Sequence, residues 1–176
     1  KSEDGQGTVY IKTQFSLSEP KENEILITKC TFDENECKES HAIHIIESVN
    51  LIHISFCKFN DCGKNDYVIS IKTQVQSISF ENNTFQFTKF DTTPSAICFH
   101  SENFNLIGNS FKNIKNTIVR FYSDMKEKKQ FQLIENNFTA CSGDSIIDAE
   151  NEVSLSPIIK GNRFEDISIL SQLMIL

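Results

Sequence analysis

Six segments of eight residues repeat along the chain with the same order of apolar and polar positions. The octads are ILITKCTF (25–32), IHISFCKF (52–59), ISFENNTF (78–85), FNLIGNSF (104–111), FQLIENNF (131–138) and PIIKGNRF (157–164). The eighth position is always phenylalanine, at Phe32, Phe59, Phe85, Phe111, Phe138 and Phe164, with intervals of 27, 26, 26, 27 and 26 residues. The third position is always large and apolar. Six matches at a nearly constant period indicate a repeat architecture.

A second kind of segment lies between the octads and alternates apolar and polar residues. These segments are GTVYIK (7–12), HAIHII (41–46), YVISIK (67–72), SAICFH (95–100), TIVRFY (117–122) and SIIDAE (145–150). Alternation over about six residues predicts a half-buried β-strand. The pairs expected to face inward are Val9/Ile11, Ile43/Ile45, Ile69/Ile71, Ile97/Phe99, Val119/Phe121 and Ile147/Ala149.

A repeat unit of 26–27 residues with short strands and no helical periodicity predicts an all-β fold, a parallel β-helix of about six coils. Equivalent residues of successive coils then form rows along the axis at the strand spacing of about 4.8 Å. The whole chain, 1–176, is expected to be one such domain. The polar stretch SLSEPKENE (16–24) is expected to be a loop inserted in the first coil.

The sixth octad position suggests what holds the corner between two sheets. It is occupied by Cys30, Cys57, Asn83, Asn109, Asn136 and Asn162. An apolar strand, a turn asparagine and a short strand carrying phenylalanine resemble the right-handed parallel β-helix of the pectate-lyase-like superfamily. That resemblance implies an asparagine ladder at this corner. Asparagine also tolerates the left-handed conformation that such a corner can need, so we expect these asparagines to turn the chain. The FxxN spacing at Phe32–Asn35 and Phe80–Asn83 is also similar to the repeats of polymorphic membrane protein-type surface adhesins.

Composition and charge restrict the classes of partner. The chain has 23% charged residues and a formal charge of −7, with lysine and arginine scattered. We therefore expect neither nucleic acid nor an anionic membrane surface as a partner. No apolar run approaches the roughly 20 residues of a membrane span. The apolar run ILSQLMIL (169–176) suggests a piece of a longer chain, or an end-on assembly through these residues.

The outward positions of the alternating strands are the candidates for ligand binding. They form two expected rows, Tyr10, His44, Ser70, Cys98, Arg120, Asp148 and Lys12, Ile46, Lys72, His100, Tyr122, Glu150. The binding candidates among them are Tyr10, His44, Lys72, His100, Arg120, Tyr122, Asp148 and Glu150. If the protein were a polysaccharide lyase, Arg120, Asp148 and Glu150 would carry the reaction. Two carboxylates make a poor calcium site, however, and the NTD and DD motifs of related hydrolases are absent.

The cysteines and histidines are candidates for a metal site and for disulfides. Cys37, His41 and His44 lie close together in CKESHAIH, but they lack the tight ligand pairs of a zinc site, so no metal and no cofactor is expected. Cys30 and Cys57 are neighbours in a row, within the usual reach of a disulfide. Cys37 and Cys62 offer a second pairing. Free thiols packed in the core are the alternative.

These observations favour a non-catalytic binding or scaffold module, an adhesin-like segment that contacts carbohydrate or protein. Extracellular or cell-surface location is favoured, although no motif fixes the compartment. Two alternatives stay open at this stage. One is a carbohydrate-active enzyme that works along the outer face of one sheet, and the other is an intracellular structural component docked end-on in a larger assembly.

Overall fold

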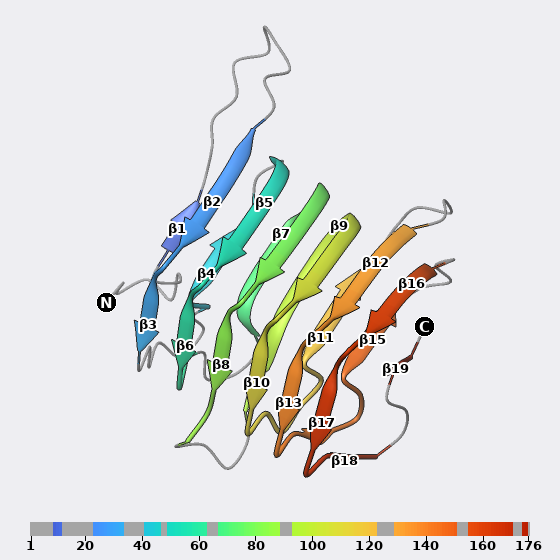
Figure 1. Ribbon diagram of the computed structural model, residues 1–176. Helices are drawn as coiled ribbons and strands as arrows, with labels where there is room; N and C mark the ends of the chain where they lie inside the picture. Colours follow the sequence, from blue (N-terminus) through green and yellow to red (C-terminus); the bar gives the residue numbers. More distant parts are fainter. Residues whose placement is uncertain are drawn as a thin grey trace, which may run out of the picture.

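The chain winds into a parallel β-solenoid (Figure 1). The computed structural model describes residues 9–11, 23–33, 41–46, 49–62, 67–88, 93–122, 129–150, 155–170 and 174–175. Every regular element in these ranges is a β-strand, and each strand pairs in parallel with its neighbour one coil away. The predicted all-β, parallel architecture is therefore confirmed.

Three faces make up the solenoid. The first face contains β1 (Val9–Ile11), β4 (Ile43–Ile45), the start of β7 (Tyr67–Glu81), the start of β9 (Ser95–Ile107), β11 (Val119–Tyr122), β15 (Ile147–Glu150) and β19 (Met174–Ile175). The second face contains β2 (Glu24–Thr28), β5 (Val49–Ser55), the ends of β7 and β9, β12 (Lys129–Ile134) and β16 (Leu155–Lys160). Because β7 and β9 run through both faces, the two form one 11-stranded sheet.

The octad phenylalanines lie on the third face. Its six strands are β3 (Thr31–Asp33), β6 (Lys58–Asn60), β8 (Thr84–Gln86), β10 (Ser110–Lys112), β13 (Asn137–Thr139) and β17 (Arg163–Glu165). A short pair, β14 (Ser142–Gly143) and β18 (Ser168–Ile169), lies beside it. The stack amounts to about four turns, somewhat fewer than the six expected. Within the described strands, β6, β8, β10 and β13 have a neighbour on both sides, whereas β3 and β17 have one.

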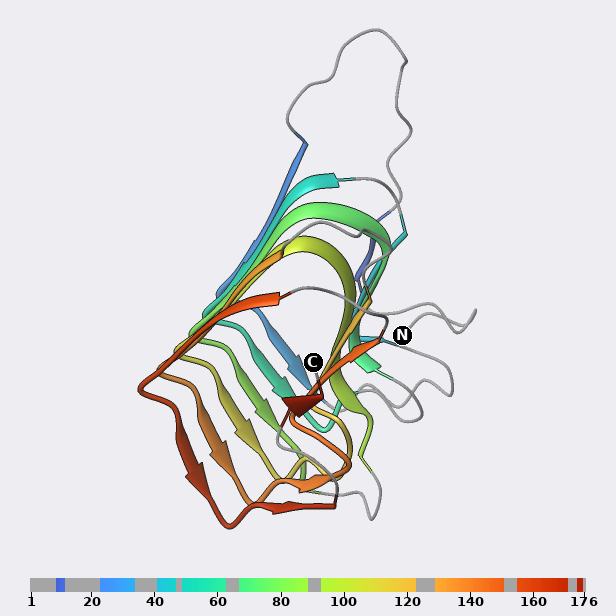
Figure 2. The same cartoon turned by 90° about the vertical axis from the view of Figure 1, so that its right-hand side faces the viewer.

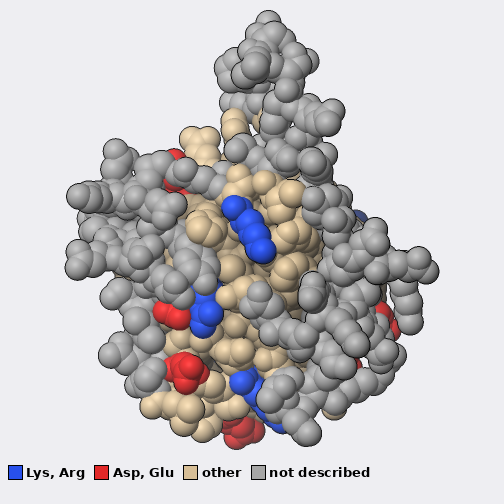
Figure 3. Space-filling model, turned by 180° about the vertical axis from the view of Figure 1, so that it is seen from behind, with Lys and Arg blue, Asp and Glu red and all other residues tan. Residues whose placement is uncertain are grey.

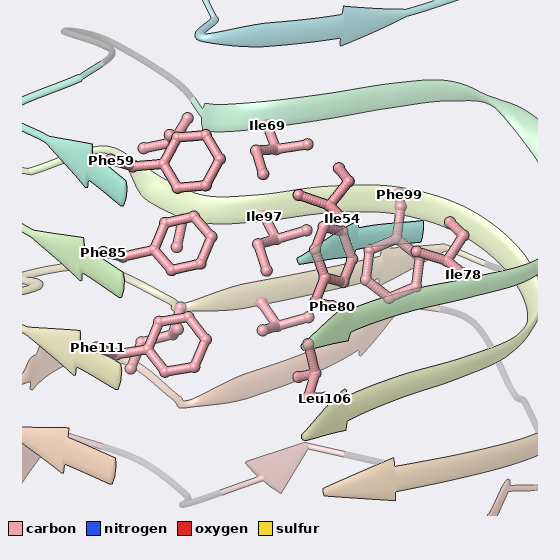
Figure 4. Packing of buried hydrophobic residues seen from close by; sticks show 14 of the residues in the cluster. Ile54, Phe59, Ile69, Ile78, Phe80, Phe85, Ile97, Phe99, Leu106 and Phe111 are labelled. Atoms are coloured by element: carbon pink, nitrogen blue, oxygen red, sulfur yellow. The ribbon is translucent and has the colours of Figure 1, made fainter. Parts of the chain in front are cut away.

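The alternating segments face the core as predicted. Ile43, Ile69, Ile97, Val119 and Ile147 occupy one register row, and all five are fully buried. The second row, with Ile45, Ile71, Phe99 and Phe121, is equally buried. Figure 4 shows isoleucines of the first face one above the other, next to a column of octad phenylalanines. Val9, Ile11 and Ala149 keep the register, but their side chains lie outside the described part of the structure.

The six octad phenylalanines form one continuous stack of rings. Neighbouring ring centroids lie 4.9, 4.7, 5.1, 5.1 and 5.1 Å apart from Phe32 to Phe164, and no pair is tilted by more than 9°. The rings are buried except at the last rung, where Phe164 is 40% exposed. Offset stacking at such distances adds to the free energy of burial, so the invariant eighth position fixes the register of the third face.

The asparagines at the sixth octad position form the expected ladder. The backbone N–H of Asn83, Asn109 and Asn136 each donates to the side-chain Oδ1 of the next asparagine at 2.9–3.0 Å. Each Nδ2 donates to the third-position carbonyl of the preceding octad, from Asn83 to Ile54, Asn109 to Phe80, Asn136 to Leu106 and Asn162 to Leu133, at 2.8, 2.8, 2.8 and 2.6 Å. The ladder thus satisfies backbone groups at a corner where no strand pairing can.

The left-handed residue at this corner is not the one predicted. The fifth octad position, not the sixth, has positive φ in all six octads, at Lys29, Phe56, Asn82, Gly108, Glu135 and Gly161 (53–67°). The reason is geometric: the fifth residue turns the chain outward and is exposed or half-buried, so that the sixth can point inward. At Gly108 a Cβ atom would lie 2.4 Å from Oδ1 of Asn82, so any other residue there would have to displace that exposed side chain as well as adopt a positive φ.

The described cysteines pack in the core or at its edge and form no disulfide with one another. Cys30 and Cys57 are in register but not disulfide-bonded, and Cys62, Cys98 and Cys141 are buried thiols. The predicted partner of Cys62, Cys37, lies outside the described residues, as do Asn35 and residues 16–22 of the expected loop. Cys57 Sγ donates to the Ile27 carbonyl at 3.7 Å, a longer version of the bond that asparagine makes in later rungs. Burial raises the pKa of the Cys57 thiol.

Candidate functional site

The first predicted outward row exists on the first face. Register pairs connect Tyr10 to His44, His44 to Ser70, Ser70 to Cys98, Cys98 to Arg120 and Arg120 to Asp148, and we call these six residues the outer row. The row is partly covered: Ser70 is fully buried, Cys98 is 7% exposed, and His44, Arg120 and Asp148 are half-buried. The side chain of Tyr10 lies outside the described part of the structure.

Arg120 joins several strands of this face. Its Nη1 donates to the Tyr67 hydroxyl at 3.1 Å, although Tyr67 belongs to β7 and β9 lies between the two residues. Its Nε lies 3.4 Å from Oδ2 of Asp148 on β15. The guanidinium is therefore held from two sides in a half-buried position. An arginine held in this way makes a rigid hydrogen-bond donor, but it is poorly suited to act as a base.

His44 lies next to Tyr10 in the outer row and stacks on His41, which precedes it by three residues. Their rings stack with centroids 4.8 Å apart, and Nδ1 of His41 lies 2.8 Å from the carbonyl oxygen of Tyr67. The pKa of His44 is lowered to about 4, first because burial disfavours the charged ring and then because His41 and Lys72 add positive charge nearby. His44 is therefore neutral at physiological pH.

The second predicted row is broken where β7 bends between the two faces. His100 pairs with Gln74 and not with Lys72, because a bulge between Ile71 and Gln74 inserts two residues into β7. Lys72 is exposed. His100 does align with Tyr122, and Tyr122 with Glu150, but the side chains of Tyr122 and Glu150 lie outside the described part, and so does Lys12. The structure thus does not bring Lys72 onto the row predicted for it.

Sequence reasoning missed a third row on the same face. His41, Tyr67, Ser95, Thr117 and Ser145 each precede an outer-row residue by three positions, and Tyr67 pairs in register with Ser95. Thr117 Oγ1 and Ser145 Oγ are 3.3 Å apart and buried. The constant offset of three residues was the available signal, but each of these residues is the first of an alternating segment, at a position that strict alternation assigns to the inward side.

The charges of this face are scattered. Seen from behind, isolated basic and acidic side chains lie among uncharged residues (Figure 3). Among the described residues, no group of three or more histidine, cysteine, aspartate or glutamate side chains could hold a metal ion. Cys37, which the sequence placed near His41 and His44, is not among them. The described outer face therefore offers uncharged polar groups, isolated charged groups such as Lys72 and Asp148, and one anchored arginine.

Comparison with known proteins adds nothing to this geometry. No protein family matches the chain, and no curated protein or solved structure is significantly similar to it. In the part of the chain that the structure describes, no helix is long and apolar enough to cross a membrane.

Proposed function

We propose that this protein is a non-catalytic binding module that presents its outer surface to an extended carbohydrate, as an adhesin-like segment of the pectate-lyase-like kind. The observation that carries the proposal is that buried and outward polar side chains have different roles. The amides of the asparagine ladder are buried and bonded, whereas outward positions repeat once per coil on a rigid parallel sheet. A polymer with a repeating unit can be bound by repeated contacts at fixed spacing.

Arg120 supports binding better than catalysis. A lyase would need a basic group free to take a proton from the substrate, together with carboxylates that hold a cation. Arg120 is instead bonded to the Tyr67 hydroxyl and lies beside Asp148. The enzyme alternative predicts cleavage of acidic polysaccharides that disappears in Arg120→Ala.

A panel of hexasaccharides tests the proposal. The neutral members are cellohexaose, xylohexaose, mannohexaose and N-acetylchitohexaose, and the acidic member is hexagalacturonate. Titration calorimetry measures binding, while ultraviolet absorbance of unsaturated products and release of reducing ends measure cleavage. Binding without product supports the proposal. Product formation that depends on Arg120 overturns it, and so does the absence of binding to every member of the panel.

End-on assembly is a second candidate, favoured by the exposed C-terminal end of the stack. Figure 2 looks onto this end, with β17 nearest the viewer. Ile159 and Phe164 are 45% and 40% exposed, whereas their equivalents one rung earlier, Leu133 and Phe138, are buried. Sedimentation velocity over a range of concentrations tests this candidate. Association that Phe164→Glu abolishes supports it, and a monomer at all concentrations contradicts it.

A further inference from the structure

A groove lies on the outside of the second face, where β2 and β5 begin and β7 enters that face. It is lined by Asn23, Glu24, Asn50, Leu51, Gln76 and Ser77, and its volume is about 290 Å³. These six residues are called the amide groove below. The groove extends across β2, β5 and β7, so it runs along the solenoid axis.

A local departure from alternation creates the amide groove. Between the buried residues Val49 and Ile52, two successive residues, Asn50 and Leu51, are more exposed. The backbone N–H groups of both donate to the carbonyl oxygen of Asn23, at 3.0 and 3.2 Å. The next rung repeats this pattern of exposure, with Gln76 and Ser77 between the buried Val75 and Ile78. Each of these rungs therefore turns two successive side chains to the surface.

The amides of this groove are available to a ligand. Asn50 and Gln76 are exposed and occupy neighbouring rungs, since Val49 pairs with Val75 and Leu51 with Ser77. Within the described residues, the side chains of Asn23, Asn50 and Gln76 make no hydrogen bond. In the asparagine ladder, by contrast, the side-chain amide of Asn83 donates to the Ile54 carbonyl and to Oδ1 of Asn109. A free amide offers one acceptor and two donors, which suits the adjacent hydroxyl groups of a sugar.

The groove's charge argues against an acidic ligand. Glu24 is the one charged residue in its lining, and the whole chain carries −7. A polyanion would meet no basic side chain in the lining and would be repelled. Leu51 adds an apolar surface at the centre, against which the C–H groups of a sugar ring can pack. A lining of neutral polar groups with one apolar contact therefore suits an uncharged glycan.

We propose that the amide groove binds a neutral, extended polysaccharide along the solenoid axis, with Asn50 and Gln76 holding hydroxyl groups on successive rungs. Strands repeat at about 4.8 Å, so the two amides would contact nearby parts of one polymer chain. This inference rests on the proposed function, because it names the ligand class and the site of that binding.

The test compares two double variants that make the same substitutions at different places on the second face. Asn50→Ala/Gln76→Ala removes the groove amides. Asn105→Ala/Gln132→Ala, the control, removes two outward amides that pair in register elsewhere on the second face and likewise make no side-chain hydrogen bond in the described structure. Calorimetric titration with the neutral hexasaccharides should give a Kd about tenfold weaker for the groove variant, from the loss of two hydrogen bonds. The control should bind like the unmodified protein.

The outcomes separate this inference from the proposed function. Neutral binding that the groove variant weakens and the control does not supports the inference. Binding to hexagalacturonate alone, or neutral binding equal in both variants, overturns the inference and leaves the proposed function standing. Binding to no hexasaccharide overturns both. Leu51→Arg, which fills the groove with a long side chain, should also abolish neutral binding, and unchanged binding in this variant counts against the site.

Discussion

At the scale of the residue, the side-chain amide serves two purposes in this chain. Inside the corner, Asn83 donates to the Ile54 carbonyl and accepts from the backbone N–H of Cys57, so it replaces strand pairing where the chain turns. On the surface, Asn50 and Gln76 have no such partner in the described structure. Burial and the position in the coil, and not the residue type, decide whether an amide holds the fold or faces a ligand.

The ladder predicts a large loss of stability in Asn83→Leu. The substitution leaves the Ile54 carbonyl without its donor and the Cys57 N–H without its acceptor, both buried. We expect unfolding free energy to fall by about 3 kcal/mol, the cost of two buried unsatisfied groups. Urea denaturation followed by circular dichroism measures it. Asn162→Leu at the half-buried end of the ladder is the control and should cost about 1 kcal/mol. Equal losses would show that the ladder does not act as described.

Cys57→Asn should increase stability. Cys57 occupies the ladder position, but its thiol reaches the Ile27 carbonyl over 3.7 Å, where asparagines in later rungs donate over 2.6–2.8 Å. An asparagine here completes another rung, and we expect a gain of about 1 kcal/mol. The same denaturation measurement checks it. Cys62→Asn, at a buried thiol outside the ladder, should destabilise the protein. A loss of stability in Cys57→Asn would mean that the corner of the second rung does not admit an amide.

At the scale of the element, rows of equivalent side chains along the first face determine its response to pH. His44 is half-buried, stacked on His41, and held neutral by burial and by the nearby positive charge of His41 and Lys72. Protonation of His44 would therefore place a charge in a half-buried position beside other positive charges.

His44 should make stability fall in acid. Its pKa is about 6.5 in the unfolded chain and about 4 in the folded protein, so the unfolded state binds the proton first. The contribution of His44 is therefore complete above pH 6.5 and is lost progressively as the pH falls toward 4. Unfolding free energies measured by urea denaturation between pH 7 and pH 4 should decrease less steeply in His44→Gln than in the unmodified protein. His53→Gln on the second face is the control, and identical slopes in all three proteins would refute the assignment.

Much of the arrangement of elements could be predicted from sequence, because each coil repeats the same local pattern. The invariant Phe85 and its equivalents gave the register of the third face, and alternation gave the buried rows around Ile69. The bulge that displaces Lys72 could not be predicted, since YVISIK alternates through the point where β7 bends. The left-handed position also escaped prediction. The period places both Asn82 and Asn83 in the corner but does not say which one turns the chain.

The candidate site was harder to predict than the fold. The outer row followed from alternation, and Arg120 and Asp148 lie together as expected. The partner of Arg120, Tyr67, is 53 residues away in sequence, and the two meet only because the coils stack. The amide groove arises where Asn50 and Leu51 interrupt alternation, which a search for alternating positions passes over.

At the scale of the whole molecule, the solenoid is a one-dimensional stack in which each coil contacts its neighbours. An interior rung buries its phenylalanine on both sides, whereas the last rung, with Phe164 40% exposed, packs on one side. Stability in such a stack is approximately a sum of terms for single coils and for neighbouring coils. The last described rung of the third face therefore lacks the stabilising interaction with one neighbouring coil, and it should open before the interior rungs.

Native-state hydrogen exchange tests this order with two equivalent amides. The N–H of Ser110 donates to the Asn83 carbonyl in an interior rung, and the N–H of Arg163 donates to the Asn136 carbonyl in the last rung, both at 2.8 Å. Because the two hydrogen bonds have the same length, a difference between the exchange rates of these amides would reflect the neighbouring coil that the last rung lacks and not the bond itself. We expect the Arg163 amide to exchange at least about tenfold faster, through local opening of β17. Equal rates would mean that the stack opens as one cooperative unit, or that something covers its C-terminal end in solution.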